Sequence, residues 1–307
     1  MKKLVFIILL IINPFLGIGQ EAAPDKPSGY FSNLTLKISY ALGWLDLIDT
    51  DFPLPNNIRE HKNIVYKTIG NKDLKLDIYH KKNISDATPL IIFIHGGAWK
   101  KGDKHDYWPY LIPYAEKGYI TATIQYRLTD VAIYPAQLND VISAINWLQE
   151  HAEEYHIDKN KIALVGGSAG GHLAMMAAYS DPSLNIKGIV NLYGPSDLTT
   201  PYAREIASVQ RLIGKSYEEV PEIYKMASPV TYISKDMPPT LTFQGTLDEL
   251  VPYEQSDNLD KKIKEAGAVS YYHKLKGWPH TMDLSVEVNE YCQYYMDEFF
   301  KKYITKN

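Results

Sequence analysis

Near the middle of the chain the sequence reads Ile162-Ala163-Leu164-Val165-Gly166-Gly167-Ser168-Ala169-Gly170-Gly171-His172-Leu173-Ala174-Met175-Met176. Four apolar residues at its start predict a short buried strand, and the residues from Leu173 to Tyr179 favour a helix. A Gly-x-Ser-x-Gly turn between a strand and a helix holds the serine in a strained conformation above the strand ends. Gly166 and Gly170 leave room where a Cβ atom would collide. Ser168 is therefore a candidate nucleophile, although a simple glycine-rich turn would also explain the pattern.

The surrounding sequence alternates between strand and helix patterns. Apolar runs of strand length are separated by helical stretches, an order typical of βαβ units with right-handed crossovers. The expected fold class is therefore α/β, with a mostly parallel central sheet and helices on both faces. The expected strands cover residues 89–94, 119–125, 162–165, 186–192, 240–244 and 269–275, with a hairpin over 64–79. The expected helices of this domain include 107–117, 135–155 and 285–303.

The first 60 residues divide into two expected segments. Lys2 and Lys3 precede a short apolar run, which predicts a signal peptide over residues 1–19 and a secreted or periplasmic protein. A retained membrane anchor is the alternative, and after cleavage no stable membrane insertion is expected. Residues 20–60 are expected to form a linker and an N-terminal cap segment, with helical spacing from Leu42 to Ile48.

The α/β domain is expected to occupy residues 61–307. Between two of its strands, residues 198–236 are longer than a crossover needs and contain two or more helical patterns. Such a helical insertion would lie over the strand ends as part of a lid.

The composition argues against several classes of partner and cofactor. The 307 residues include 32 Lys and Arg against 36 Asp and Glu, a formal net charge of −4. No dense basic stretch could neutralise phosphates, so a nucleic-acid partner is not expected. The single cysteine, Cys292, precludes an internal disulfide and is expected to be a small buried apolar side chain. No metal-ligand set is visible, so neither a metal nor another cofactor is expected.

A serine nucleophile needs a base and an acid that orients the base. His280 lies in a loop after the last expected strand, and loops at the carboxyl ends of parallel strands face one crevice. Asp248 and Asp197 each follow an earlier strand, so both are candidate acids. Either gives the chain order Ser…Asp…His. Asp248 is preferred, because Asp197 would also serve as a helix N-cap at the start of the insertion.

Acyl transfer also requires backbone N–H groups that stabilise a developing oxyanion. One donor would come from Ala169, directly after the candidate nucleophile. Further donors would come from Gly96 and Gly97 in His95-Gly96-Gly97-Ala98-Trp99, which follows an expected strand. A glycine turn after a strand is the alternative, but it does not explain why this turn and the Ser168 turn occur together in this order.

Taken together, these motifs resemble the α/β-hydrolases of the esterase/lipase group related to hormone-sensitive lipase, and most closely their secreted bacterial feruloyl- or acetyl-esterase-like branch. The motifs run in order from residue 95 to residue 280: His95 to Trp99, Tyr126-Arg127-Leu128, Tyr134 to Gln137, Asp140, Gly166 to His172, Ala227-Ser228-Pro229, the Asp248 loop and His280. The resemblance implies Ser168 as nucleophile, His280 as general base and then acid, and Asp248 as its partner. It also implies an oxyanion hole formed by Gly96, Gly97 and Ala169.

Two residues depart from the family pattern. Ala98 replaces the third glycine of the oxyanion motif, which would narrow the acyl pocket without removing a donor. Gln244 occupies a position that is often histidine in relatives, and we expect it to have no effect on the three catalytic residues.

The expected activity is that of a secreted serine carboxylesterase. It would hydrolyse short-chain or aromatic acyl esters through an acyl-enzyme, including acetyl or feruloyl esters of polysaccharides, and Trp99 would contact this small-molecule or carbohydrate-linked ester. An arylformamidase or small-amide hydrolase with the same three residues is the alternative within the fold. A catalytically silent binding protein is the alternative from another class, and the intact Ser168, Asp248 and His280 argue against it.

Overall fold

The computed structural model describes residues 22–305, and the expected signal peptide, residues 1–19, lies outside this range. Within the described residues the strands form one eight-stranded sheet in the order β1-β2-β4-β3-β5-β6-β7-β8. β2 pairs antiparallel with both β1 and β4, and all the other neighbours are parallel. The strands are β1 (Ile58–Ile69), β2 (Lys72–Lys81), β3 (Thr88–Ile94), β4 (Ile120–Ile124), β5 (Ile157–Gly167), β6 (Gly188–Leu192), β7 (Thr240–Gly245) and β8 (Ser270–Leu275).

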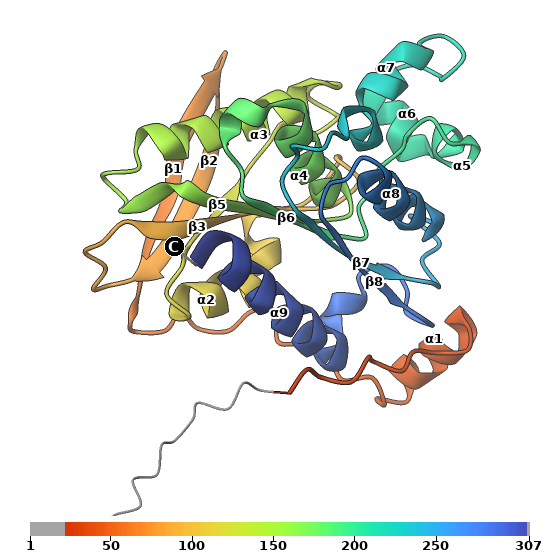
Figure 1. The fold of residues 1–307 in the computed structure, drawn as a ribbon, viewed down its shortest axis with the longest axis horizontal. Coiled ribbons are helices and arrows are strands. Elements are labelled where there is room, and N and C mark those ends of the chain that lie inside the picture. Colours follow the sequence, from red (N-terminus) through yellow and green to blue (C-terminus); the bar gives the residue numbers. More distant parts are fainter. Residues whose placement is uncertain (1–21, 306–307) are drawn as a thin grey trace, which may run out of the picture.

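Helices cover both faces of the sheet, which confirms the expected α/β class (Figure 1). The side chains of α3, α4 and α8 belong to the apolar core on one face, and those of α2 and α9 to the core on the other. The α-helices are α1 (Asn33–Ala41), α2 (Trp108–Glu116), α3 (Ala136–Glu150), α4 (Ala169–Ser180), α5 (Pro201–Glu205), α6 (Ala207–Ile213), α7 (Pro221–Met226), α8 (Glu254–Glu265) and α9 (Val286–Phe300).

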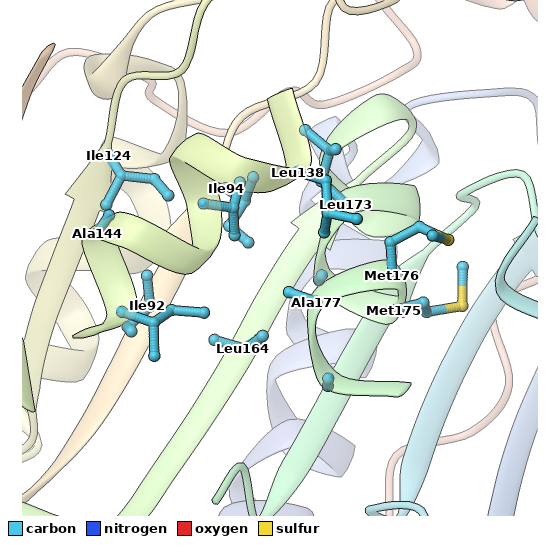
Figure 2. Packing of buried hydrophobic residues seen from close by; sticks show 14 of the residues in the cluster. Ile92, Ile94, Ile124, Leu138, Ala144, Leu164, Leu173, Met175, Met176 and Ala177 are labelled. Atoms are coloured by element: carbon cyan, nitrogen blue, oxygen red, sulfur yellow. The ribbon is translucent and has the colours of Figure 1, made fainter. Parts of the chain in front are cut away.

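The middle of the sheet is apolar because both of its faces are buried, as in the runs Leu90–Ile94 of β3 and Ile162–Val165 of β5. In β3, Ile92 and Ile94 pack toward α3 and α4, whereas Ile91 and Phe93 pack toward α2 and α9. Figure 2 shows the first of these layers, in which strand residues meet the small and branched side chains of two helices: Ile92, Ile94 and Leu164 against Leu138, Ala144, Leu173 and Ala177. Cys292 is fully buried in the opposite layer, as expected.

The N-terminal segment differs from the expectation. The helix expected from Leu42 to Ile48 is absent, and α1 instead ends at Ala41. Gly43 follows with a φ of +70°, a left-handed conformation that stops a helix. Beyond it the chain runs extended, and Leu47 forms an antiparallel bridge with Ser285 near the other end of the domain.

Some element boundaries also differ. The long middle helix stops at Glu150, so residues 151–155 form turns, and β5 begins at Ile157 instead of Ile162. The first strand begins at Ile58 instead of residue 64. The expected insertion holds three short helices, α5, α6 and α7, in agreement with the two or more that were expected.

A buried carboxylate joins three elements on the α3 side of the sheet. Asp140 of α3 is fully buried, and Arg127 reaches it with its Nε (2.7 Å) and Nη2 (2.9 Å). The backbone N–H of Arg127 also donates to Asp140 Oδ2 at 3.0 Å. Lys67 of β1 donates its Nζ to Asp140 Oδ1 at 2.9 Å. This network ties the antiparallel edge of the sheet to the loop after β4.

Replacing Asp140 with alanine should destabilise the protein by about 3 kcal/mol, because it leaves two partly buried cations without their counter-charge. Urea unfolding followed by circular dichroism measures this loss. Asp86→Ala, at an exposed carboxylate, should change the stability by less than about 0.5 kcal/mol. Equal effects of the two substitutions would show that the network contributes nothing.

His172 is a buried, neutral imidazole at the start of α4. Its Nε2 donates to the Ala227 carbonyl at 2.7 Å, and its ring meets the Trp99 ring edge-on at a centroid distance of 5.1 Å. Burial lowers the pKa of His172 to about 4 from the usual 6.5, because the imidazolium would lose its hydration. The side chain therefore favours the folded state only while it stays unprotonated.

The free energy of unfolding should fall as the pH drops from 6.5 toward 4. In this window the unfolded chain binds a proton at residue 172 and the folded chain does not, so stability that is fully present above pH 6.5 is lost. In His172→Gln the slope of stability against pH should be smaller by up to about 1.4 kcal/mol per pH unit, the value for one proton. Urea titrations at pH 7.5, 5.5 and 4.5 measure the slope, and an identical slope in the variant would contradict this origin.

Candidate active site

Ser168 lies at a strained turn between β5, which ends at Gly167, and α4, which begins at Ala169. Its φ of 55° and ψ of −123° are costly for a residue with a Cβ atom. The turn is possible because its flanking glycines lie against backbone. A Cβ atom on Gly170 would lie 1.9 Å from the Ile94 carbonyl oxygen, and one on Gly166 would lie 2.3 Å from the Gly170 carbonyl carbon. The local sequence thus presents one hydroxyl at the start of a helix.

His280 and Asp248 are brought together from two different loops. His280 follows β8, Asp248 follows β7, and His280 Nδ1 lies 2.6 Å from Asp248 Oδ2. Because a carboxylate only accepts hydrogen bonds, Nδ1 carries the proton and Nε2 remains the basic nitrogen. This is the tautomer that a serine-activating base requires.

Asp248 is held by four hydrogen bonds. Oδ1 accepts from the backbone N–H groups of Leu250 (2.9 Å) and Val251 (2.8 Å). Oδ2 accepts from His280 and from Gln244 Nε2, at 2.9 Å. Gln244 therefore contacts the candidate acid directly, so the expectation that it has no effect on this group is wrong. Ser256 in turn donates its hydroxyl to Gln244 Oε1 at 3.0 Å, which fixes the orientation of the amide.

Asp197, the other candidate acid, is occupied elsewhere. Its Oδ1 accepts from the backbone N–H (3.0 Å) and the hydroxyl (2.6 Å) of Thr199. The N-cap of α5 is Thr200, so Asp197 is not the cap that the alternative interpretation proposed. The structure pairs His280 with Asp248.

A buried aromatic group supports the His280 ring. The ring of Tyr193 lies 4.5 Å from that of His280, centroid to centroid. The hydroxyl of Tyr193 donates to Asp283 Oδ1 at 2.5 Å, and Tyr110 donates to Asp283 Oδ2 at 3.0 Å. Burial raises the pKa of the Asp283 carboxyl above its usual 3.8. The sequence analysis missed Tyr193 and Asp283, since their only local signal is proximity to a strand end and to His280.

The loop after β3 approaches the Ser168 turn closely. A Cβ atom on Gly96 would lie 2.9 Å from the Gly167 carbonyl oxygen, and Gly97 has a φ of +97°. His95 stacks on Tyr126 at a centroid distance of 4.3 Å, and the Tyr126 hydroxyl donates to the His95 carbonyl at 2.9 Å. These contacts hold the backbone of Gly96 and Gly97 beside the start of α4. The N–H of Ala169 lies there, at the positive end of the helix dipole.

A small cavity of about 130 Å³ opens beside Ser168. Ala98, Trp99 and Ala169 are among its lining residues, and the expected contact of Trp99 with substrate stays a prediction. Trp99 is itself almost fully buried. The opposite wall comes from α5 and α6 of the insertion and from the residues after Asp248: Tyr202, Ala203, Ile206, Ser208, Val209, Leu250, Val251 and Pro252.

Residues 22–305 contain neither a candidate metal centre nor a candidate membrane span. No group of three or more His, Cys, Asp or Glu side chains in this range could hold a metal ion. None of the helices in the same range is long and apolar enough to cross a membrane.

Several known proteins with similar sequences or structures are esterases. Esterase LipQ of Mycobacterium tuberculosis is 30% identical over 265 residues, which cover 80% of this chain and 63% of LipQ. A truncated carbohydrate esterase from gut microbiota superposes with a TM-score of 0.71 at 27% identity, covering 81% of this chain and 97% of that one. Esterase 2 of Thermogutta terrifontis, phosphonylated by cyclosarin, superposes with a TM-score of 0.69 at 26% identity, covering 81% and 95%.

The fold and these similarities define the class, an α/β-hydrolase of the esterase group related to hormone-sensitive lipase. Residues 76–263 match the BD-FAE family, and the chain belongs to that family. The chain spans between about half and two thirds of the length of three mycobacterial esterases that it matches, LipQ, LipC and LipM.

Asp248→Asn should lower kcat for an activated ester such as p-nitrophenyl acetate by roughly 10⁴-fold, because an amide at this position favours the wrong imidazole tautomer. Asp197→Asn should leave kcat within about twofold, since its carboxylate contacts only the local turn. Steady-state kinetics at pH 7.5 compare the two variants. A large loss in Asp197→Asn with little loss in Asp248→Asn would reverse the assignment of the acid.

Proposed function

We propose that the protein is a serine carboxylesterase that removes short acyl groups from carbohydrate-linked esters. The observation that carries this proposal is the 2.6 Å contact between His280 and Asp248. A serine in a strained strand-to-helix turn supports it. The esterase names of its relatives support the same activity. Export of the mature protein is part of the proposal and rests on the expected signal peptide over residues 1–19.

The proposed reaction passes through an acyl-enzyme. His280 Nε2 takes the proton of Ser168 as Oγ attacks the ester carbonyl carbon, and Asp248 stabilises the imidazolium that forms. The N–H groups of Gly96, Gly97 and Ala169 stabilise the negative charge on the carbonyl oxygen. His280 then gives its proton to the leaving alcohol. Water, deprotonated by the same imidazole, releases the acid and restores Ser168.

The size of the Ser168 cavity favours a short acyl group. Its volume of about 130 Å³ is below the range of roughly 300–1,000 Å³ that is typical of small-molecule pockets. Acetyl, propionyl and butyryl groups suit such a cavity better than a feruloyl group with its substituted ring. Structures of the Thermogutta esterase hold propionate and butyrate, which supports this preference.

A carbohydrate-linked alcohol is proposed for the other half of the ester. The support is the resemblance to the gut-microbiota carbohydrate esterase, which aligns over 97% of that protein's chain. The alternative, an arylformamidase, would use the same three residues. Substitutions of these residues would therefore affect both activities alike, and only a comparison of substrates can distinguish them.

Ser168→Ala should abolish hydrolysis of p-nitrophenyl acetate, and Ser208→Ala should retain most of it. Ser208 is a matched control because its side chain lines the same cavity but lies outside the proposed nucleophilic turn. An organophosphate should add one covalent group to the wild type and none to Ser168→Ala, as measured by intact-protein mass spectrometry. A substrate panel compares p-nitrophenyl esters from acetyl to octanoyl with methyl ferulate and N-formylkynurenine. The wild type should show its highest kcat/KM on the short acyl esters. Full activity of Ser168→Ala would overturn the proposal.

A further inference from the structure

Residues 27–48 form a segment, here called the strap, that is hydrogen-bonded to both ends of residues 277–286, the His280 loop. The two ends of the loop share backbone and side-chain hydrogen bonds with opposite ends of the strap. At one end, Tyr30 N–H donates to the Gly277 carbonyl (2.8 Å) and Trp278 Nε1 donates to the Pro27 carbonyl (3.3 Å). At the other end, Ile48 N–H donates to the Leu284 carbonyl (2.9 Å) and Val286 N–H donates to the Asp46 carbonyl (3.0 Å).

Between these two attachments the strap carries α1 past the candidate acid. Asn33 of α1 donates its Nδ2 to the Glu249 carboxylate at 2.6 Å and to the Leu247 carbonyl at 3.3 Å. In the view of Figure 1, α1 lies at the lower corner of the molecule and α5 and α6 at the upper corner of the same side. The strap and the insertion both reach the loop after β7, since Asn33 and Tyr202 each hydrogen-bond to Glu249.

The helix of the strap has no role in the core. None of the residues of α1 is buried, and several of its large side chains are exposed, Leu34 at 67% and Tyr40 at 61%. An apolar helix surface of this kind is costly in water unless it serves contact with another molecule. Because α1 lies next to the His280 loop, a substrate bound at His280 is a candidate for this contact.

A cavity of about 310 Å³ lies between the strap and the His280 loop. It shares no lining residue with the cavity beside Ser168. His280 lines it, together with apolar and polar residues of both segments: Leu36, Lys37, Tyr40, Leu45 and Leu47 from the strap, and Pro279, Thr281, Met282 and Leu284 from the loop.

The two cavities are distinguished by the catalytic groups that line them. The Ser168 cavity is lined by the nucleophile and by Ala169, which are the groups that act on the acyl carbon and its oxygen. The strap cavity is lined by His280, the group that protonates the departing alcohol oxygen. An ester bound across both would place its acyl group in the first cavity and its alcohol in the second.

We propose that the strap cavity binds the alcohol half of the ester as a sugar ring, with the apolar face of the ring on Tyr40. This inference rests on the proposed function and adds the place and the chemistry of the alcohol. A pyranose has an apolar face and a rim of hydroxyl groups. The cavity offers leucine side chains and an exposed aromatic ring for the face, and the Lys37 ammonium and Thr281 hydroxyl for the rim.

The strap cavity lies outside the part of the chain that matches the family. The match covers residues 76–263, whereas the walls of the cavity come from residues 36–47 and 278–285. The segments that would set the preference for the alcohol thus lie outside the region that matches the family model.

The test compares two acetyl esters that differ only in the alcohol, acetylated xylotriose and ethyl acetate. Tyr40→Ala in the full chain should lower kcat/KM for acetylated xylotriose roughly 5- to 20-fold, mainly through KM, because the lost stacking serves ground state and transition state alike. Ethyl acetate should be hydrolysed within about twofold of wild type. Phe31→Ala, an aromatic residue of the same strap that is 95% exposed and does not line the cavity, should change neither.

A second measurement uses unacetylated xylotriose as an inhibitor of ethyl acetate hydrolysis. It should compete in the wild type and in Phe31→Ala, and lose its inhibition in Tyr40→Ala. Equal losses on both esters would show that Tyr40 acts only by holding the His280 loop and would overturn the proposal. The proposal would also be overturned if Tyr40→Ala had wild-type kinetics on both esters but bound phospholipid vesicles more weakly than wild type. In that case α1 would serve a membrane surface. If wild type hydrolyses neither ester, the proposed function itself fails; if it hydrolyses ethyl acetate alone, only the sugar site fails.

Discussion

The contact between Gly170 and the carbonyl of Ile94 is the constraint on which the site depends. With no Cβ atom at residue 170, the first turn of α4 lies directly against the end of β3. The Ser168 turn and the loop of Gly96 and Gly97 come from separate βα units, and this approach places them in one crevice. A packed contact of backbone against backbone has little freedom to shift, so the two loops keep a fixed relation.

Much of the fold follows from local patterns, and the exceptions have physical causes. The central strands are predictable because strands buried on both faces are apolar throughout. Leu42, Leu45 and Ile48 imitate the spacing of a helix, but Gly43 adopts a left-handed conformation and ends α1 before them. The residues that follow are extended because Leu47 pairs with Ser285, a partner that no local window contains.

The candidate site divides in the same way. Ser168, Asp248 and His280 each follow the carboxyl end of a parallel strand, so topology alone predicts that they meet. Gln244 and Asp283 were not predicted because their roles depend on where a side chain points. Gln244 ends a buried strand and turns its amide to Asp248, and Asp283 turns inward to two tyrosine hydroxyls. Neither direction is encoded in spacing.

The strap also joins the two ends of the domain during folding. Pro27 and Trp278 are separated by 251 positions, yet their hydrogen bond holds one end of the loop that carries His280. A ribosome releases the strap well before the loop, and contacts so distant in sequence form late. A growing chain therefore carries its serine turn long before it possesses a held base. Under the proposed function, the chain becomes able to hydrolyse esters only after the His280 loop has been made and the strap has closed on it.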